Sequence, residues 1–429
     1  MALRILLGNG VFKNINEIKP AHFAIFNKSG CHINRYWKLE SKPHTDDFKT
    51  TCDTIYFLLE DSIKKQLISD TPLCTMLSGG LDSSIITAYT SNFYKSKDMP
   101  KLNTLSVDYV DNDKNFVKSD FQPNSDNYYI DIISSTFNTN HKCIVLDTPE
   151  LANTLKDAMI ARDLPGMADV DSSLLLFCKN IKNEYNIALS GECSDEIFGG
   201  YPWFFREDAL SSNTFPWSIA TSERQNLLHP DISKKIKLKE YIDYRYDESL
   251  EEVTLLGEDS IETAEKRKIS HLTFNWFMQT LLDRADRMAR TYGLDIRVPF
   301  CDYRIVQYMW NVPWEIKALD GREKGLLRHV AKDLLPKEIV ERKKSPYPKT
   351  HNPNYLAKVK GMLINIMNDK HSPINNLLNR KYILDIINTN GKAFTRPWFG
   401  QLMTGPQLMA YLIQVNQWLE EYKPEIILK

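Results

Sequence analysis

Residues 78–84 read Ser-Gly-Gly-Leu-Asp-Ser-Ser, between an apolar run at 73–77 and a helix-like run at 85–91. This order predicts a strand, a tight turn and the start of a helix. Glycines permit the strained backbone of such a turn, and the N–H groups of the turn and of the helix N-terminus bind anions well. Serine hydroxyls add donors, and Asp82 can hold a cation against the same anion. We interpret the stretch as a phosphate cradle.

The cradle is not of the Walker type, because the chain contains no G-x-x-x-x-G-K-[ST] pattern. A pyrophosphate cradle instead suggests attack at the α-phosphate and release of pyrophosphate. That chemistry is adenylation, not phosphoryl transfer by a kinase. A surface turn without function is the alternative, but the flanking strand, the helix and Asp82 argue against it.

Strands and helices alternate outward from the cradle. Further strands are expected at 102–109, 142–146 and 187–190, helices at 46–67, 126–138, 151–161 and 172–184, and a long loop at 111–127. This alternation implies a parallel sheet covered on both faces. Ligands of such sheets lie beyond the carboxyl ends of the strands, where Ser78 and Ser190 both stand.

The two ends of the chain follow other patterns. Residues 1–45 predict a small β-rich lead-in, and because a single hairpin is marginal alone it must pack on something else. Beyond about residue 205 helical periods dominate and no clear strand is expected. The apolar spacing at 278–290 indicates a core helix.

Composition excludes several classes of protein. The 429 residues include 54 basic and 55 acidic residues, a net charge of −1, which leaves no electrostatic footprint for nucleic acid or an anionic membrane. The seven cysteines form no C-x-x-C pair, which predicts free thiols in a reducing cytoplasm. No apolar run is long enough for a membrane span, and we find no signal peptide.

A second stretch, Ser-Gly-Glu-Cys-Ser-Asp-Glu at 190–196, follows the last expected strand. Its three carboxylates repel one another unless a cation lies among them, and a magnesium–nucleotide complex would be one such cation. The alternative is a helix N-cap whose acids favour the helix dipole. Glu196 is the acid that fits a functional role least.

Together the two stretches resemble the asparagine synthetase family, specifically its ATP-dependent synthetase domain. Further agreement lies at 165–173, 284–290, 295–300, 321–328, 345–351 and 398–403. The resemblance implies an α/β fold with a parallel sheet of the adenine nucleotide α-hydrolase (PP-loop ATP pyrophosphatase) type and a large helical C-terminal part. It divides the chain into a β-rich remnant of a glutaminase domain (1–45), a PP-loop ATP-binding core (46–205) and a mainly helical C-terminal part (206–429).

The resemblance also implies ATP and Mg²⁺ as cofactors. The expected nucleotide contacts are Leu77 and Val107 for adenosine, Ser78, Gly79, Gly80, Asp82 and Ser83 for pyrophosphate, and Ser190 and Gly191 at the later strand end. Asp82 and Asp195 would hold magnesium on the pyrophosphate.

Two residues would act in the chemistry. Glu192 resembles the carboxylate tied to the acyl-AMP intermediate, with proton removal from incoming ammonia as a plausible physical role. Lys324 resembles the lysine that offsets charge on the α-phosphate, the alternative being a solvated helix lysine. For the basic run at 342–344 we prefer a solvated face to a phosphate contact.

The chain departs from glutamine-hydrolysing members of this family, which carry a catalytic cysteine directly after the initiator Met. Residue 2 is Ala here, and Cys31 is not N-terminal. We therefore expect no glutamine hydrolysis by this chain alone. Free ammonia, another amine and ammonia from a separate glutaminase subunit stay open as nitrogen sources, as do a truncated chain and a homodimer.

The leading hypothesis is an ATP-dependent amide ligase that adenylates a carboxylate, by default aspartate, and releases pyrophosphate. Ammonia or another amine then attacks to give the amide, by default asparagine. One alternative is amide-forming tailoring of a natural product or peptide. A tRNA thiolase is disfavoured by the absent C-x-x-C and the neutral charge. A non-catalytic nucleotide-binding subunit is disfavoured by the intact Asp82, Glu192, Asp195 and Lys324.

Overall fold

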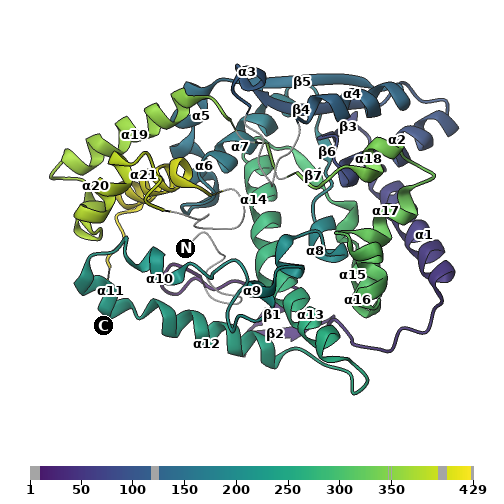
Figure 1. The fold of residues 1–429 in the computed structure, drawn as a ribbon, viewed down its shortest axis with the longest axis horizontal. Helices are drawn as coiled ribbons and strands as arrows, with labels where there is room; N and C mark the ends of the chain where they lie inside the picture. The colour runs from purple at the N-terminus through teal and green to yellow at the C-terminus, as the bar shows by residue number, and fades with distance from the viewer. Residues whose placement is uncertain (1–9, 117–124, 346, 349, 395–402, 427–429) are drawn as a thin grey trace.

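A parallel sheet lies at the centre of the computed structural model, which describes residues 10–116, 125–345, 347–348, 350–394 and 403–426. Its strands are β3 (Leu73–Met76), β4 (Asn103–Tyr109), β5 (Asn140–Leu146), β6 (Ile187–Leu189) and β7 (Asp295–Arg297). Their spatial order is β5-β4-β3-β6-β7, and every pairing is parallel. The predicted α/β class is therefore confirmed (Figure 1).

Helices cover both faces of the sheet, as the sequence predicted. Those of the first two hundred residues are α1 (Phe48–Gln66), α2 (Leu81–Ser96), α3 (Asn112–Asn115), α4 (Asn127–Thr136), α5 (Thr148–Asn153), α6 (Leu155–Arg162), α7 (Asp169–Lys182) and α8 (Ser194–Phe198). Successive strand side chains point to opposite faces. Leu73 accordingly packs in the core that contains α1 and α2, whereas Cys74 packs in the core that contains α7.

Three details differ from the sequence-based expectation. The helix expected at 151–161 is two helices, α5 and α6, separated at Thr154. The loop expected at 111–127 contains the short α3, and its residues 117–124 lie outside the described part of the chain.

The third difference is β7, because we expected no strand beyond residue 205. Asp295-Ile-Arg is too short and too polar to show a strand period, and pairing with β6 is what makes it a strand. Ile187 pairs with Asp295 and Leu189 with Arg297, and the Ser190 N–H donates to the Arg297 carbonyl at 2.8 Å. The fifth strand of the sheet thus comes from the part predicted to be helical.

The rest of that part is helical, as predicted. Its elements are α9 (Glu207–Leu210), α10 (Thr221–Gln225), α11 (Pro230–Ile236), α12 (Leu238–Glu251), α13 (Ile261–Leu272), the π-helical η2 (Thr273–Met278), α14 (Gln279–Arg290), α15 (Tyr303–Asn311), α16 (Trp314–Lys317), α17 (Gly325–Ala331), α18 (Lys337–Glu341), α19 (Pro353–Asn368), α20 (Arg380–Asn388) and α21 (Gly405–Tyr422). Short 3₁₀ turns lie at Pro202–Phe204, Pro299–Cys301, Leu319–Gly321 and Pro373–Asn376. The core helix expected at 278–290 is α14, which packs against α7 and β7.

The N-terminal hairpin consists of β1 (His22–Asn27) and β2 (Gly30–Arg35). We expected it to pack on another element, yet Phe26 is 76% exposed and Ile33 59% exposed. Within the described residues, that expectation is wrong for these side chains.

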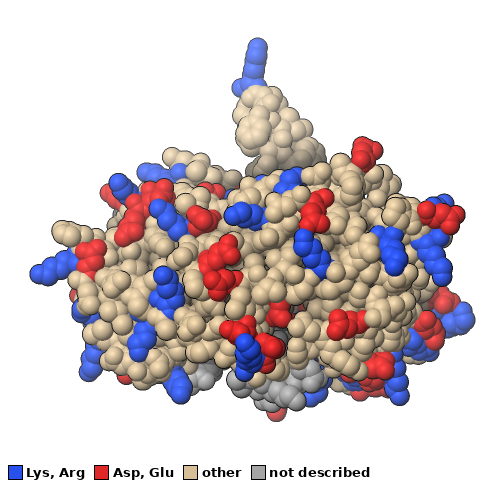
Figure 2. Space-filling view, turned by 90° about the horizontal axis from the view of Figure 1, so that it is seen from above, with Lys and Arg blue, Asp and Glu red and all other residues tan. Residues whose placement is uncertain are grey.

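The surface carries both signs of charge. Acidic and basic side chains are interspersed on the face shown in Figure 2, as the balanced composition predicts. None of the described helices is long and apolar enough to cross a membrane.

Candidate active site

A cavity of about 280 Å³ lies at the carboxyl ends of β3 and β6 and along the end of β4. Predicted site residues line it from both halves of the chain: Leu77, Ser78, Gly80, Asp82, Ser83, Val107, Ser190, Gly191, Glu192, Asp195 and Lys324. Gly79 is the one predicted residue that does not line the cavity. The structure thus brings together two stretches more than 100 residues apart and adds Lys324 from beyond both.

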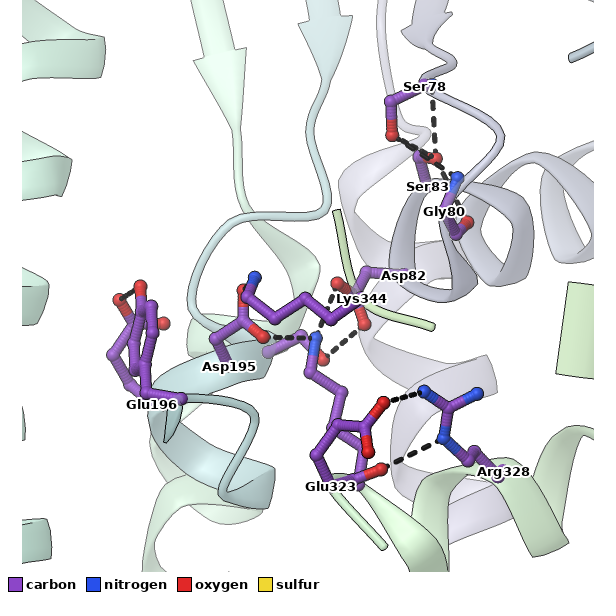
Figure 3. A network of polar contacts seen from close by, with 12 residues as sticks. Ser78, Gly80, Asp82, Ser83, Asp195, Glu196, Glu323, Arg328 and Lys344 are labelled. Atoms are coloured by element: carbon purple, nitrogen blue, oxygen red, sulfur yellow. Dashed lines mark hydrogen bonds and ion pairs between the residues drawn. The ribbon is translucent and has the colours of Figure 1, made fainter. Parts of the chain in front are cut away.

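The loop at 78–83, here called the nucleotide loop, is closed by its own hydroxyls (Figure 3). Ser83 Oγ lies 3.0 Å from Ser78 Oγ, accepts from the Ser78 N–H at 3.2 Å and donates to the Gly80 carbonyl at 3.2 Å. Gly80 is the N-cap of α2 without a side-chain cap. The first N–H groups of this helix therefore stay available for an anion.

Two glycines let the surrounding backbone approach the loop. Gly79 has φ +68°, and a Cβ there would lie 2.7 Å from Tyr129 Cβ, so only glycine lets the loop pack against α4. A Cβ on Gly191 would lie 2.9 Å from Asp82 Cβ. The second stretch therefore touches the first at the start of α2.

The carboxylates of Asp82 and Asp195 converge on one ammonium group. Lys324 Nζ lies 2.6 Å from Asp82 Oδ2 and 2.7 Å from Asp195 Oδ1. The Lys324 side chain is only 3% exposed, so the alternative of a solvated helix lysine is wrong. Lys344 also pairs with Asp195, and Ser194 Oγ donates to Asp82 Oδ1 at 2.7 Å.

These ion pairs set the charge of the cluster. Burial raises the pKa of Asp195, but Lys324 and Lys344 outweigh burial and bring that pKa down to about 2. Burial lowers the pKa of Lys324, and the two aspartates more than compensate, so its pKa is raised. Asp195 therefore stays ionised near neutral pH, paired with the ammonium groups of Lys324 and Lys344.

The aspartate pair fits magnesium bound together with a nucleotide. Mg²⁺ is usually held by one or two carboxylates plus phosphate oxygens and water, and Asp82 and Asp195 already share one cation. Among the described residues, no group of three or more His, Cys, Asp or Glu could hold a metal by itself. The site therefore fits the metal only with a phosphate ligand present.

Glu192 lies against a buried arginine that the sequence reasoning left without a role. Arg284 Nη2 on α14 donates to Glu192 Oε1 at 3.1 Å, while Glu192 Oε2 is buried with no hydrogen-bond partner among the described residues. Burial raises the pKa of Glu192 and Arg284 opposes that rise; the net pKa is raised. An acceptor atom thus remains free beside the cavity.

Glu196 is more involved than expected. It is 2% exposed, lines the cavity and accepts from the Tyr201 hydroxyl at 2.9 Å. Burial, followed by the charge of Asp195, raises its pKa to about 7. Our low expectation for Glu196 considered the helix dipole alone, and the sequence did not reveal this burial.

The basic run at 342–344 is not the solvated face that we preferred, except at Lys343, which is exposed. Arg342, Lys343 and Lys344 all line the cavity, and the side chains of Arg342 and Lys344 are 3% and 20% exposed. In the sequence, three consecutive basic residues before Ser345-Pro346 are typical of an exposed segment. Their acidic partners, Asp126 and Asp195, lie far away in the sequence, so the pairing could not be predicted.

Comparisons with known proteins bear on this cavity. The asparagine synthase family model matches residues 54–420. The chain is 48% identical over 420 residues to asparagine synthetase (glutamine-hydrolyzing) 3 of Bacillus subtilis, covering 98% of this chain and 68% of that protein. It is 26% identical to asparagine synthetase (glutamine-hydrolyzing) 1 of the same organism, covering 78% of this chain and 55% of that protein. With the rat asparagine synthetase (glutamine-hydrolyzing) the identity is 25%, covering 70% and 44%.

Proposed function

The chain belongs to the asparagine synthase family, and from this premise we propose that it is an ATP-dependent amide ligase. The observation that carries the proposal is the convergence of the nucleotide loop, the Asp82–Lys324–Asp195 cluster and Glu192 on one cavity. The acid substrate, by default aspartate, is adenylated with release of pyrophosphate. Ammonia then attacks the acyl-AMP to give the amide and AMP.

In this proposal the nucleotide loop binds the pyrophosphate part of ATP, and Leu77 and Val107 lie beside the adenosine. Asp82 and Asp195 hold Mg²⁺, which offsets the phosphate charge when bound. As the substrate carboxylate attacks, negative charge develops around the α-phosphate. Lys324, already at 2.6 Å from Asp82 Oδ2, is placed to offset that charge.

Glu192 is the proposed acceptor of the proton that ammonia loses on attack. Burial raises its pKa, which makes the carboxylate a better proton acceptor than an exposed glutamate. Oε2 supplies the free acceptor atom, and Arg284 fixes the other oxygen. Arg284 thereby limits how far the carboxylate can turn.

The nitrogen source, the domain division and the assembly remain proposals. We propose ammonia as the donor, either free or delivered by a separate glutaminase. The domain boundaries at 45/46 and 205/206 remain predictions. β7 lies after the second boundary but pairs with β6, which lies before it. A cytoplasmic location is consistent with the seven free thiols, and a homodimer stays open.

The test is to measure pyrophosphate and asparagine with MgATP, aspartate and ammonium. We expect both products in equal amounts from the wild-type chain. Glu192→Gln should retain ATP binding and lose asparagine formation, because the amide cannot accept the proton. A folded wild-type chain that binds ATP but releases no pyrophosphate with aspartate would rule out the default substrate.

A further inference from the structure

Arg342 lies where the C-terminal part of the chain meets the nucleotide loop. It follows α18 directly, and its side chain is 3% exposed. The proposed chemistry gives it no role. A buried guanidinium is costly unless it is well paired, so its partners show what it does.

Apart from the nearby Ser345 Oγ, which accepts from Nη2 at 3.3 Å, the partners of Arg342 belong to the nucleotide loop and to the start of α4. Nη1 donates to the Ser78 carbonyl at 3.1 Å, Nη2 pairs with the Asp126 carboxylate, and the guanidinium lies 4.1 Å from the centre of the Tyr129 ring. One planar group therefore makes a hydrogen bond, an ion pair and a cation–π contact, a combination that suits arginine.

The main chain of Arg342 is held from the opposite side. Arg328 on α17 donates from Nη1 to the Arg342 carbonyl at 2.9 Å and also to the Val340 carbonyl, and from Nη2 to Glu323 Oε1 at 2.7 Å. Arg342 is thus fixed at its backbone before its side chain reaches the loop. Arg342 therefore connects α17 and α18 to the Ser78 carbonyl through a continuous chain of hydrogen bonds.

The Ser78 carbonyl belongs to the same planar peptide unit as the Gly79 N–H. In a trans peptide these two groups point in opposite directions, so a donor that fixes the carbonyl also fixes the direction of the N–H. Gly79 can adopt many backbone conformations, and its hydroxyl-bearing neighbours do not bond this carbonyl. Arg342 supplies the constraint that the loop lacks.

We propose that Arg342 is a positioning residue for the nucleotide, which holds the Ser78–Gly79 peptide of the nucleotide loop in the orientation that binds the ATP phosphates. This inference rests on the proposed function, since it takes the ligand of the loop to be ATP. Arg342 acts through the loop and through Asp126, so its removal weakens nucleotide binding more than it slows the reaction of bound nucleotide.

The test compares Arg342→Ala, Arg342→Lys and Asp126→Asn with Arg322→Ala. Arg322 pairs with Glu341 on the same stretch but does not line the cavity, so it controls for loss of a nearby ion pair. The measurements are MgATP affinity by calorimetry, KM for ATP and kcat in pyrophosphate release, and thermal unfolding of each variant.

We expect Arg342→Ala to raise Kd and KM for ATP about 10- to 100-fold, with kcat within about 3-fold of wild type. Lysine cannot bond both partners and stack at once, so Arg342→Lys should be impaired nearly as much. Asp126→Asn should shift ATP affinity the same way by a smaller factor, and Arg322→Ala should leave it unchanged.

Unchanged ATP affinity in folded Arg342→Ala would overturn the inference, and so would full affinity in Arg342→Lys, which would indicate a point charge alone. If Arg342→Ala does not fold, Asp126→Asn decides: an affinity equal to wild type overturns the inference. If the wild-type chain is inactive with aspartate, calorimetry still tests Arg342, because ATP binding needs no acid substrate. Weakened binding would then support Arg342 while counting against aspartate.

Discussion

The nucleotide loop and the opposite wall of the cavity are built in different ways. The loop at 78–83 is closed by hydrogen bonds between residues at most five apart. The opposite wall, formed by Lys324, Arg342 and Lys344, reaches the rest of the site through contacts that span 149 to 264 residues. The loop can form locally, whereas the wall exists only once the whole chain has folded.

The two sides of the cavity also offer different chemical groups to a ligand. Apart from the Asp82 carboxylate, the loop offers backbone N–H groups and hydroxyls, which carry no charge of their own. The three basic residues of the wall supply the positive charge, and all three are paired with acids or a carbonyl of the other half of the cavity. We expect removal of Lys324 to alter the rate, and changes in the loop, or in Arg342 that holds the Ser78 carbonyl, to alter binding.

The largest effect is expected for Lys324→Ala. It removes the cation shared by Asp82 and Asp195 and should lower kcat for pyrophosphate release about 10²- to 10³-fold. It should also destabilise the fold, since two partly buried carboxylates lose a partner. Single-turnover assays on folded protein measure the first effect. A kcat within a few-fold of wild type would show that the wall does not control the charge of the reaction.

Glu196 should make stability depend on pH. Its pKa of about 7 in the fold lies above the unfolded value of roughly 4.3, so the folded state binds the proton more tightly. The stability from Glu196 is full below the unfolded pKa and is lost as pH rises through 7, by up to about 4 kcal/mol. Glu196→Gln should therefore gain stability relative to wild type at pH 8 but not at pH 4.

Urea unfolding at pH 4 and pH 8 checks this prediction. Asp195 shows the opposite dependence of stability on pH. The pKa of Asp195 is lowered to about 2, so its contribution is present above the unfolded pKa and is lost as pH falls through 2. Equal pH profiles for wild type and Glu196→Gln would contradict the assignment of Glu196.

Gly79→Ala tests the loop side of the comparison. The added Cβ would lie 2.7 Å from Tyr129 Cβ at a residue with φ +68°, which should cost about 1–3 kcal/mol of stability and weaken ATP binding. Gly257→Ala is the matched control, because a Cβ there meets nothing within 4 Å. Equal unfolding midpoints and ATP affinities for the two variants would show that the loop does not need its glycine.

The smallest effect is expected for Lys344→Ala, because Lys324 still pairs with Asp195 after the change. A loss of about 10-fold in kcat/KM for ATP, near 1.4 kcal/mol, is the expected size for one partly exposed ion pair at a charged ligand. Steady-state kinetics across salt concentrations measures it. A loss as large as that of Lys324→Ala would mean that the two lysines act as one unit.

The same contrast explains what the sequence predicted. Ser78 and Ser190 could be placed at strand ends because strands, turns and helix starts are local patterns. The resemblance pointed to Lys324, and the structure brings it to the aspartates. Arg284 and Arg342 could not be assigned, since an arginine on a helix or directly after one looks the same whether its partner is water or a buried acid. β7 was not predicted because its three residues show no strand pattern of their own and become a strand only by pairing with β6.

β7 also has a consequence for the order in which the protein is made. About 100 residues separate β6 from the strand that pairs with it, and a ribosome adds roughly 5–20 residues per second. For several seconds of synthesis β6 has one open edge, which is the kind of surface that recruits other strands. The Ser190 N–H, at the rim of the cavity, gains its acceptor on Arg297 only when that interval ends. During that interval the growing chain therefore carries an open strand edge beside the cavity.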